Sequence, residues 1–263
     1  LYVDRNGTLV WGGVVWGRTY NSQAQAFTFT AREFESYFER RRISSTTAFT
    51  NADQLVIART LIDNAQALAY GDIGVITGSE TSGVLVDRIY YDYELKTVYS
   101  AIQDLSRQEN GFDFNITVAY DPVTYEPTKT LVLGYPRTGT AYDVDTPGIP
   151  VFEFPAGNVV EYEYPEDGSI AANTLYVLGA GSNEGRVSAT AQDTTKLDEG
   201  WALLEDQANY SDTTDQTIIN ELASARVLAL STPPPIIKLV VPAFTEPQYG
   251  TYEIGDDVRL RIT

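Results

Sequence analysis

Carboxylates are the side chains whose types and spacing could support catalysis in this chain. Glu161 and Glu163 alternate with apolar and aromatic residues across 159–164, and this pattern predicts a strand with both carboxylates on one face. Two carboxylates on one face can serve as acid and base in glycoside hydrolysis. Further candidates of this kind are Asp92 with Glu94, Glu153, and Asp256 with Asp257. Because the chain contains 36 acidic residues, such pairs also arise by chance, and we expect no catalytic residue among them.

Clustered carboxylates also raise the question of a calcium site, because hard cations bind oxygen ligands. The candidates are the Asp-Val-Asp segment 143–145 and the pair Asp256 and Asp257, but neither fits an EF-hand loop. We interpret both as solvated loops and expect no metal site. The glycine-rich segment 179–185 has the spacing GxGxxxG and precedes a strand-like segment, whereas a phosphate-binding loop precedes a helix. It predicts a hairpin loop, so we expect no bound cofactor.

Three residue types are missing from the 263 residues: the chain contains no Cys, no His and no Met. Without imidazole and thiol groups, the chain by itself cannot carry out Ser–His–Asp or Cys–His catalysis. It also cannot form a disulfide framework. The chain starts at Leu1 and both of its ends read as strands, so we expect it to be a stretch of a longer polypeptide.

The charge balance is strongly acidic. Eighteen basic residues against 36 acidic ones leave a formal net charge of −18. Direct binding to nucleic acid requires clustered Lys and Arg, so we do not expect it here. The basic cluster 40–42 (Arg-Arg-Arg) is interpreted as the solvated end of a helix. No apolar run approaches the roughly 18 residues that span a bilayer, so we expect a soluble chain without direct membrane insertion.

The first elements that would position these side chains are strands. Residues 1–11 predict a hairpin, in which Asn6 and Gly7 supply the positive φ angles of the turn. The glycines at 12–13 indicate a bulge or a close approach of another segment. Residues 25–30 alternate as a half-buried strand, and residues 31–41 carry aromatic residues at helical spacing. Phe27 and Phe29 are expected in the core, as are Phe112 and Phe114.

Three longer helices are predicted further along the chain. The first covers about 51–70 and is capped by Thr50 or Asn51, the second covers about 97–108, and the third about 214–229. Strands are expected at 112–118, 130–133, 159–164, 174–178, 186–191, 236–241 and 258–262. The pattern predicts an α+β fold with three segments: the remainder of a β-domain at 1–44, an α+β module at 45–140, and a β-rich second domain with one helix at 141–263.

Aromatic residues are abundant, with 18 Tyr, 10 Phe and 3 Trp. Tyr and Trp combine a large contact area with a polar atom and are enriched at protein–protein interfaces. The cluster Tyr90, Tyr91 and Tyr93 cannot point inward as a whole from one strand, so part of it faces a partner or the solvent. We prefer a subunit interface to a plain solvent-exposed surface, with Trp11 and Trp16 as further interface candidates.

Several soft motifs together resemble one family. The segments 1–7 and 10–16 resemble the early β-domain of Gp37-like minor tail proteins from siphophages of actinobacteria, a group typified by a Rhodococcus phage. Residues 27–42 resemble the aromatic, helical and Arg-rich continuation of that family. Residues 175–181 resemble its later Leu-Gly-x-Gly turn, and residues 252–262 its closing strand. None of these motifs is a catalytic signature.

The resemblance implies a baseplate hub protein in the tail tip of the virion. It implies a β-rich hub with barrel-like β-domains, an inserted α+β module and no catalytic residues. It further implies self-assembly into a ring, most often a homotrimer, that closes the tail tube. The partners would be the distal tail, tape-measure and other tail-tip proteins, with genomic DNA passing through the lumen. An acidic lumen wall would keep DNA from adsorbing, although the acidity could equally serve virion solubility alone.

Two other functions remain open at this stage. The first is a carbohydrate-active protein, either a glycosidase that uses pairs such as Glu161 and Glu163 or a sugar-binding module that uses exposed aromatic residues. The second is a spike component of a bacterial secretion or injection system with the same architecture.

Overall fold

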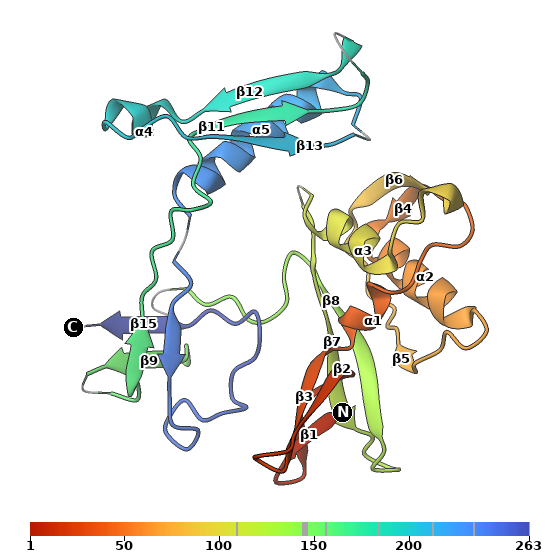
Figure 1. The fold of residues 1–263 in the computed structure, drawn as a ribbon, viewed down its shortest axis with the longest axis vertical. Coiled ribbons are helices and arrows are strands. Elements are labelled where there is room, and N and C mark those ends of the chain that lie inside the picture. Colours follow the sequence, from red (N-terminus) through yellow and green to blue (C-terminus); the bar gives the residue numbers. More distant parts are fainter. Residues whose placement is uncertain are drawn as a thin grey trace. The chain divides into compact units, whose positions relative to one another are not determined.

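The computed structural model divides the chain into two compact units (Figure 1). The first unit is Leu1–Pro150 with Gly250–Arg259, and the second is Val151–Tyr249 with the chain end from Leu260. The residues that the structure describes are 1–108, 110–143, 147–155, 157–182, 185–211, 213–233 and 235–262. The segment boundaries expected at 44/45 and 140/141 stay predictions.

The first unit begins with an antiparallel sheet of β1 (Tyr2–Arg5), β2 (Thr8–Asn21) and β3 (Ala26–Glu33). The predicted hairpin turn is confirmed, because Asn6 has φ 54° and Gly7 has φ 86°. The long strand β2 pairs with β1 over its first part and with β3 from Gly13 onward. Its register shifts between Val15 and Gly17, where a bulge bends the strand.

The close approach predicted at the glycines 12–13 is confirmed. A Cβ atom on Gly12 would lie 2.7 Å from Cγ1 of Val118, and one on Gly13 would collide with the carbonyl oxygen of Arg32. Val118 belongs to β7 (Asp113–Tyr120), against which β2 packs. The absence of a side chain at Gly12 therefore lets the N-terminal sheet contact the rest of the unit.

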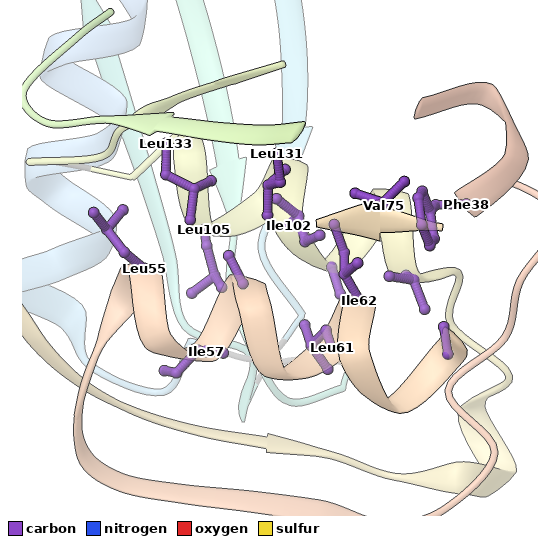
Figure 2. Close-up of a cluster of buried hydrophobic side chains, with 14 of the residues drawn as sticks. Phe38, Leu55, Ile57, Leu61, Ile62, Val75, Ile102, Leu105, Leu131 and Leu133 are labelled. Atoms are coloured by element: carbon purple, nitrogen blue, oxygen red, sulfur yellow. The ribbon is translucent and has the colours of Figure 1, made fainter. Parts of the chain in front are cut away.

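The remainder of the first unit combines two small sheets with helices. The sheets are β4 (Thr47–Asp53) with β6 (Leu85–Tyr90), and β5 (Val75–Ile76) with β8 (Pro127–Gly134) and β7. The helices are α1 (Glu35–Phe38), α2 (Gln54–Ala67), η1 (Asp92–Glu94) and α3 (Val98–Ser106). Figure 2 shows Leu133 of β8 pointing toward Leu105 of α3, and Leu131 of β8 lying beside Ile102 of the same helix, within one buried cluster.

Two predictions about the helices of this unit were wrong. Residues 31–41 do not form one helix, because Ala31, Arg32 and Glu33 continue β3 in register with β2 and leave only the four residues of α1 helical. The cap of α2 is neither Thr50 nor Asn51, which belong to β4. Asp53 caps the helix instead, with a carboxylate oxygen 2.9 Å from the amide nitrogen of Leu55.

The second unit is built around a three-stranded sheet that packs against one helix. Strands β12 (Ser188–Gln192), β11 (Thr174–Leu178) and β13 (Glu205–Asn209) lie in that order, with β12 antiparallel and β13 parallel to β11. Helix α5 (Gln216–Ser231) contributes Ile219, Ala223 and Val227 to a core with Leu175 and Val177. The helix predicted at 214–229 and the strands predicted at 174–178 and 186–191 are confirmed within one or two residues.

The other elements of the second unit are short. Strand β9 (Val151–Phe154) pairs with β15 (Arg259–Ile262), and β10 (Glu161–Glu163) pairs with β14 (Lys238–Val240). Helix α4 (Thr194–Asp198) follows β12. The predicted α+β class is confirmed, with several small sheets and few helices. Among the described residues, no helix is long and apolar enough to cross a membrane.

Candidate functional site

The outer half of the β2–β3 hairpin carries an aromatic cluster on one face. Tyr20 lies directly opposite Phe27 in the register, and Arg18 lies opposite Phe29. The ring centroids of Tyr20 and Phe27 are 4.9 Å apart, and those of Phe27 and Phe29 are 6.3 Å apart. The guanidinium of Arg18 lies 5.5 Å from the centre of the Phe27 ring, within the range of a cation–π contact. We call these four residues the hairpin face.

The hairpin face is open to solvent. Tyr20, Phe27 and Phe29 are 54%, 56% and 55% exposed. The prediction that Phe27 and Phe29 belong to the core was wrong, because β3 pairs with β2 but its side chains are exposed along almost the whole strand. Phe112, in contrast, is buried as predicted. Three rings on one face of a two-stranded ribbon form an apolar patch of the kind that marks an interaction surface.

The two Trp candidates lie on the same strand as this cluster. Trp11 is half-buried, and Trp16 is 45% exposed. The indole nitrogen of Trp16 donates a 2.8 Å hydrogen bond to Oγ of Ser36 in α1. Oγ of Ser36 in turn donates to the carbonyl oxygen of Glu33 at 2.6 Å. The inner part of the hairpin is thus anchored to α1, whereas the hairpin face beyond it is not.

The Tyr90–Tyr93 cluster divides between core and surface. Tyr90 is only 4% exposed and meets the Phe49 ring edge-on, so it presents no surface to a partner. Tyr91 and Tyr93 point outward, with stacked rings 5.0 Å apart, and Tyr93 is 73% exposed. The turn is held by Asp92, whose Oδ1 accepts hydrogen bonds from Oγ1 of Thr46 at 2.9 Å and from the Tyr93 amide at 3.0 Å.

This turn is acidic as well as aromatic. Asp92 and Glu94 flank Tyr93, and we call residues 91–94 the acidic turn. The pKa of the Tyr93 hydroxyl is raised, first by desolvation and then by the neighbouring Tyr91, Glu94 and Asp92. The outer part of the hairpin has the opposite character, because residues 17–30 contain Arg18 and no Asp or Glu. The chain therefore offers a basic aromatic surface and an acidic aromatic surface within one unit.

A hollow of about 250 Å³ lies beside the foot of the hairpin. It is lined by Arg32, Glu33, Glu35, Ser36, Glu39, Tyr99, Phe114 and Asn115. One carboxylate oxygen of Glu35 accepts the amide hydrogen of Ile116. The other oxygen of Glu35 and the side-chain oxygen of Asn115 are buried without a hydrogen-bond partner among the described residues.

Of the charged side chains around this hollow, some form ion pairs and others do not. Burial raises the pKa of the Glu35 carboxyl, against the lowering effect of backbone hydrogen bonds. The guanidinium of Arg32 instead binds Glu39, at 2.5 and 2.8 Å, and this hydrogen bond lowers the pKa of Glu39. In the described part of the chain, Glu35 is therefore a desolvated carboxyl without a cationic partner. Nothing in the sequence pattern pointed to it, because the segment that contacts Glu35 through the Ile116 amide lies 81 residues further along.

The predicted carboxylate pairs lie at the surface. Glu161 and Glu163 are exposed on the short β10, and Glu163 forms a 3.0 Å ion pair with Lys238 on β14. Asp257 forms a 2.8 Å ion pair with Arg137, which lowers the pKa of the carboxyl. Glu163 and Asp257 thus each bind a neighbouring cation, and neither lines the hollow beside the foot of the hairpin.

The predicted calcium candidates are also accounted for within the described part of the chain. Asp256 accepts backbone hydrogen bonds from Thr140 at 2.6 Å and Glu253 at 2.8 Å, as a loop-stabilising carboxylate does. Val144 and Asp145 lie outside the described residues. Among those that are described, no group of three acidic residues is placed to hold a metal ion.

The glycine-rich segment and the Arg cluster have structural roles. Residues 179–181 follow β11 in an antiparallel hairpin with β12, as predicted, and Nε of Arg186 binds the carbonyl oxygen of Gly179 at 2.9 Å. Asn183 and Glu184 in the same loop lie outside the described residues. Arg41 is not solvated as predicted, because its guanidinium donates to Oη of Tyr37 and to the carbonyl oxygen of Ala65.

The fold is similar to two solved tail proteins. No family model and no curated protein matches the chain. The tail protein from Neisseria meningitidis MC58 has a TM-score of 0.58 at 11% identity, over 97% of this chain and 70% of that one. The 43 kDa tail protein of prophage MuSo2 from Shewanella oneidensis has a TM-score of 0.55 at 15% identity, over 98% of this chain and 70% of that one. The α+β arrangement described above is thus a fold that this chain shares with phage tail proteins.

Proposed function

We propose that this chain is a structural, non-enzymatic protein of a bacteriophage tail. The observation that carries the proposal is the extent of the likeness, which runs through 97% and 98% of the chain in two separate tail proteins. A match of this extent includes both compact units and is not limited to one common motif. The lack of Cys and His agrees with a role in assembly.

The finer proposal places the chain in the tail tip, as a hub of the Gp37-like kind. There it assembles as a ring, a homotrimer in the simplest case, that closes the tail tube and supports host attachment and genome delivery. Its neighbours are the distal tail, tape-measure and other tail-tip proteins. The exposed aromatic surfaces of the first unit support this role, since a ring requires interfaces. Part of the charge of −18 would face the lumen, where it repels passing DNA.

The test is a reconstruction of purified phage particles together with antibody labelling of the chain. We expect the label at the distal end of the tail and a closed ring of copies around the tail axis. Particles that lack the chain altogether would refute the tail role. A chain found along the tail tube would refute the tail-tip assignment alone, whereas a chain found in the capsid would refute the tail role as well. A basic lumen wall would contradict the proposed repulsion of DNA.

A further inference from the structure

The hairpin face requires a covering surface. A two-stranded ribbon is marginally stable in water unless it packs against something else. Three aromatic rings that each leave about half of their area exposed offer roughly 300 Å² of apolar surface. This area is too small for a complete interface, but it is the size of an aromatic anchor at the centre of one. Arg18, seated on the Phe27 ring, adds a positive charge to the anchor.

The charge on the hairpin indicates the kind of surface that covers it. The outer part of the hairpin, residues 17–30, carries Arg18 and no acid, whereas the whole chain carries 36 acids against 18 bases. Arg32, at the inner end of the hairpin, is already paired with Glu39. Copies of this chain as a whole therefore repel one another, but the hairpin of one copy is attracted to the acidic surface of the next. The acidic turn combines negative charge with aromatic rings and so complements the hairpin face, since Asp92 and Glu94 lie beside the stacked rings of Tyr91 and Tyr93.

We propose that the hairpin face of one copy docks on the acidic turn of a second copy, with Arg18 facing Asp92 and Glu94. The inference rests on the proposed assembly into a ring and names the surfaces that build it. The two surfaces differ, so the contact is head-to-tail and closes into a ring when the rotation between copies allows it. In Figure 1 the β2–β3 turn lies at one end of the first unit, and the β4–β6 sheet that leads into the acidic turn lies at the other end.

Charge reversal tests the pairing in the purified chain. Sedimentation velocity over a concentration series gives the dissociation constant of the assembly. We expect Arg18→Glu and Glu94→Arg each to raise it by tenfold or more, and the double variant to recover most of the loss, because each copy then carries both reversed surfaces. Arg226→Glu, which reverses an exposed charge on α5, is the matched control and leaves the constant unchanged.

Truncation of the anchor tests the apolar part. Phe27→Ala is expected to raise the dissociation constant roughly thirtyfold, as removal of a central aromatic residue does in other interfaces. Phe244→Ala removes an exposed ring of the same type in the second unit and serves as the control. A photo-crosslinking amino acid at position 27 then identifies the covering surface, and we expect an intermolecular product that contains residues 91–94.

The outcomes separate this inference from the function. A chain that stays monomeric at all concentrations, a crosslink to another surface, or no recovery in the charge-reversed double variant overturns the proposed contact. If the chain is nevertheless found in tail tips, the proposed function stands without this contact. If the contact is confirmed in solution but the chain is absent from particles, the function is refuted and the interface stands.

Discussion

Replacement of Asp53 by Ala tests how the first unit is held together. Asp53 is almost fully buried at the start of α2. One of its carboxylate oxygens accepts the amide hydrogen of Leu55, and the other accepts from the Ser82 amide, the Ser82 hydroxyl and, at 2.7 Å, the Gly83 amide. The side chain thus caps the helix and also fixes the loop before β6.

The expected cost follows from these contacts. Loss of a helix cap destabilises by about 1 kcal/mol. The amides of Ser82 and Gly83 also lose their acceptor, but Ser82 is half-buried and Gly83 is exposed, so water replaces part of the loss and the further cost is about 0.5–1.5 kcal/mol. We expect Asp53→Ala to lower the free energy of unfolding by roughly 1.5–2.5 kcal/mol in total. Urea unfolding followed by Trp fluorescence measures it, since Trp11 and Trp16 lie in the first unit.

The same variant has a defined pH dependence. Burial alone would raise the pKa of Asp53, but the hydrogen bonds from Leu55, Gly83 and Ser82 outweigh it and leave the pKa below its ordinary value. The stabilisation is therefore complete above the unfolded pKa of about 3.9 and is lost as the pH falls through the lowered folded pKa. The difference between the wild type and Asp53→Ala should shrink over that acidic range.

Thr50→Ala is the control, because the sequence alone indicated Thr50 or Asn51 as the cap. Thr50 lies exposed in β4, so its replacement should change stability by less than about 0.5 kcal/mol. If Thr50→Ala were as costly as Asp53→Ala, or if Asp53→Ala cost less than about 0.5 kcal/mol, the assignment of the cap would be refuted.

Three further predictions concern the first unit. Glu35→Gln should make the protein more stable than the wild type at pH 8 but not at pH 4. The pKa of Glu35 is raised in the folded state, so the folding stability of the wild type falls as the pH rises from the ordinary pKa towards the raised one. Equal unfolding profiles of the two proteins at both pH values would contradict this. Ile102→Ala should cost about 2–5 kcal/mol in urea unfolding, since the side chain is fully buried between helices and sheets. Gly12→Ala should lower the thermal midpoint and reduce the free energy of unfolding by about 1–3 kcal/mol, because the new methyl group pushes β2 away from Val118. Gly168→Ala is the control and should leave the midpoint unchanged, because nothing lies near its Cβ position.

Local patterns predicted the elements whose formation depends on nearby residues. Asn6 and Gly7 specify a tight hairpin turn by their backbone preferences. Thr97 caps α3 through the amide of Ser100, three residues away. The apolar spacing along 214–229 predicted α5 because its buried stripe faces a single sheet.

Local patterns failed where a distant segment decided the outcome. Aromatic spacing in 31–41 favours a helix, yet pairing with β2 keeps Ala31–Glu33 extended. For Phe27 and Phe29, alternation indicates that one face of the strand is apolar but not whether anything covers it. The sequence singled out Tyr91, Tyr93 and Trp16 as candidate interface residues, and their side chains are exposed. It also included Tyr90, which is buried, and it missed Tyr20.

Composition alone determined the acidic charge and the absence of imidazole and thiol chemistry, because both depend only on which residues are present. Backbone preferences over a few residues determined the first turn and the longer helices. Tertiary structure decided which apolar faces stay uncovered and which carboxyl loses its water, as at Phe27 and Glu35. Both properties depend on contacts between segments far apart in the chain, and these contacts form only when the whole unit folds.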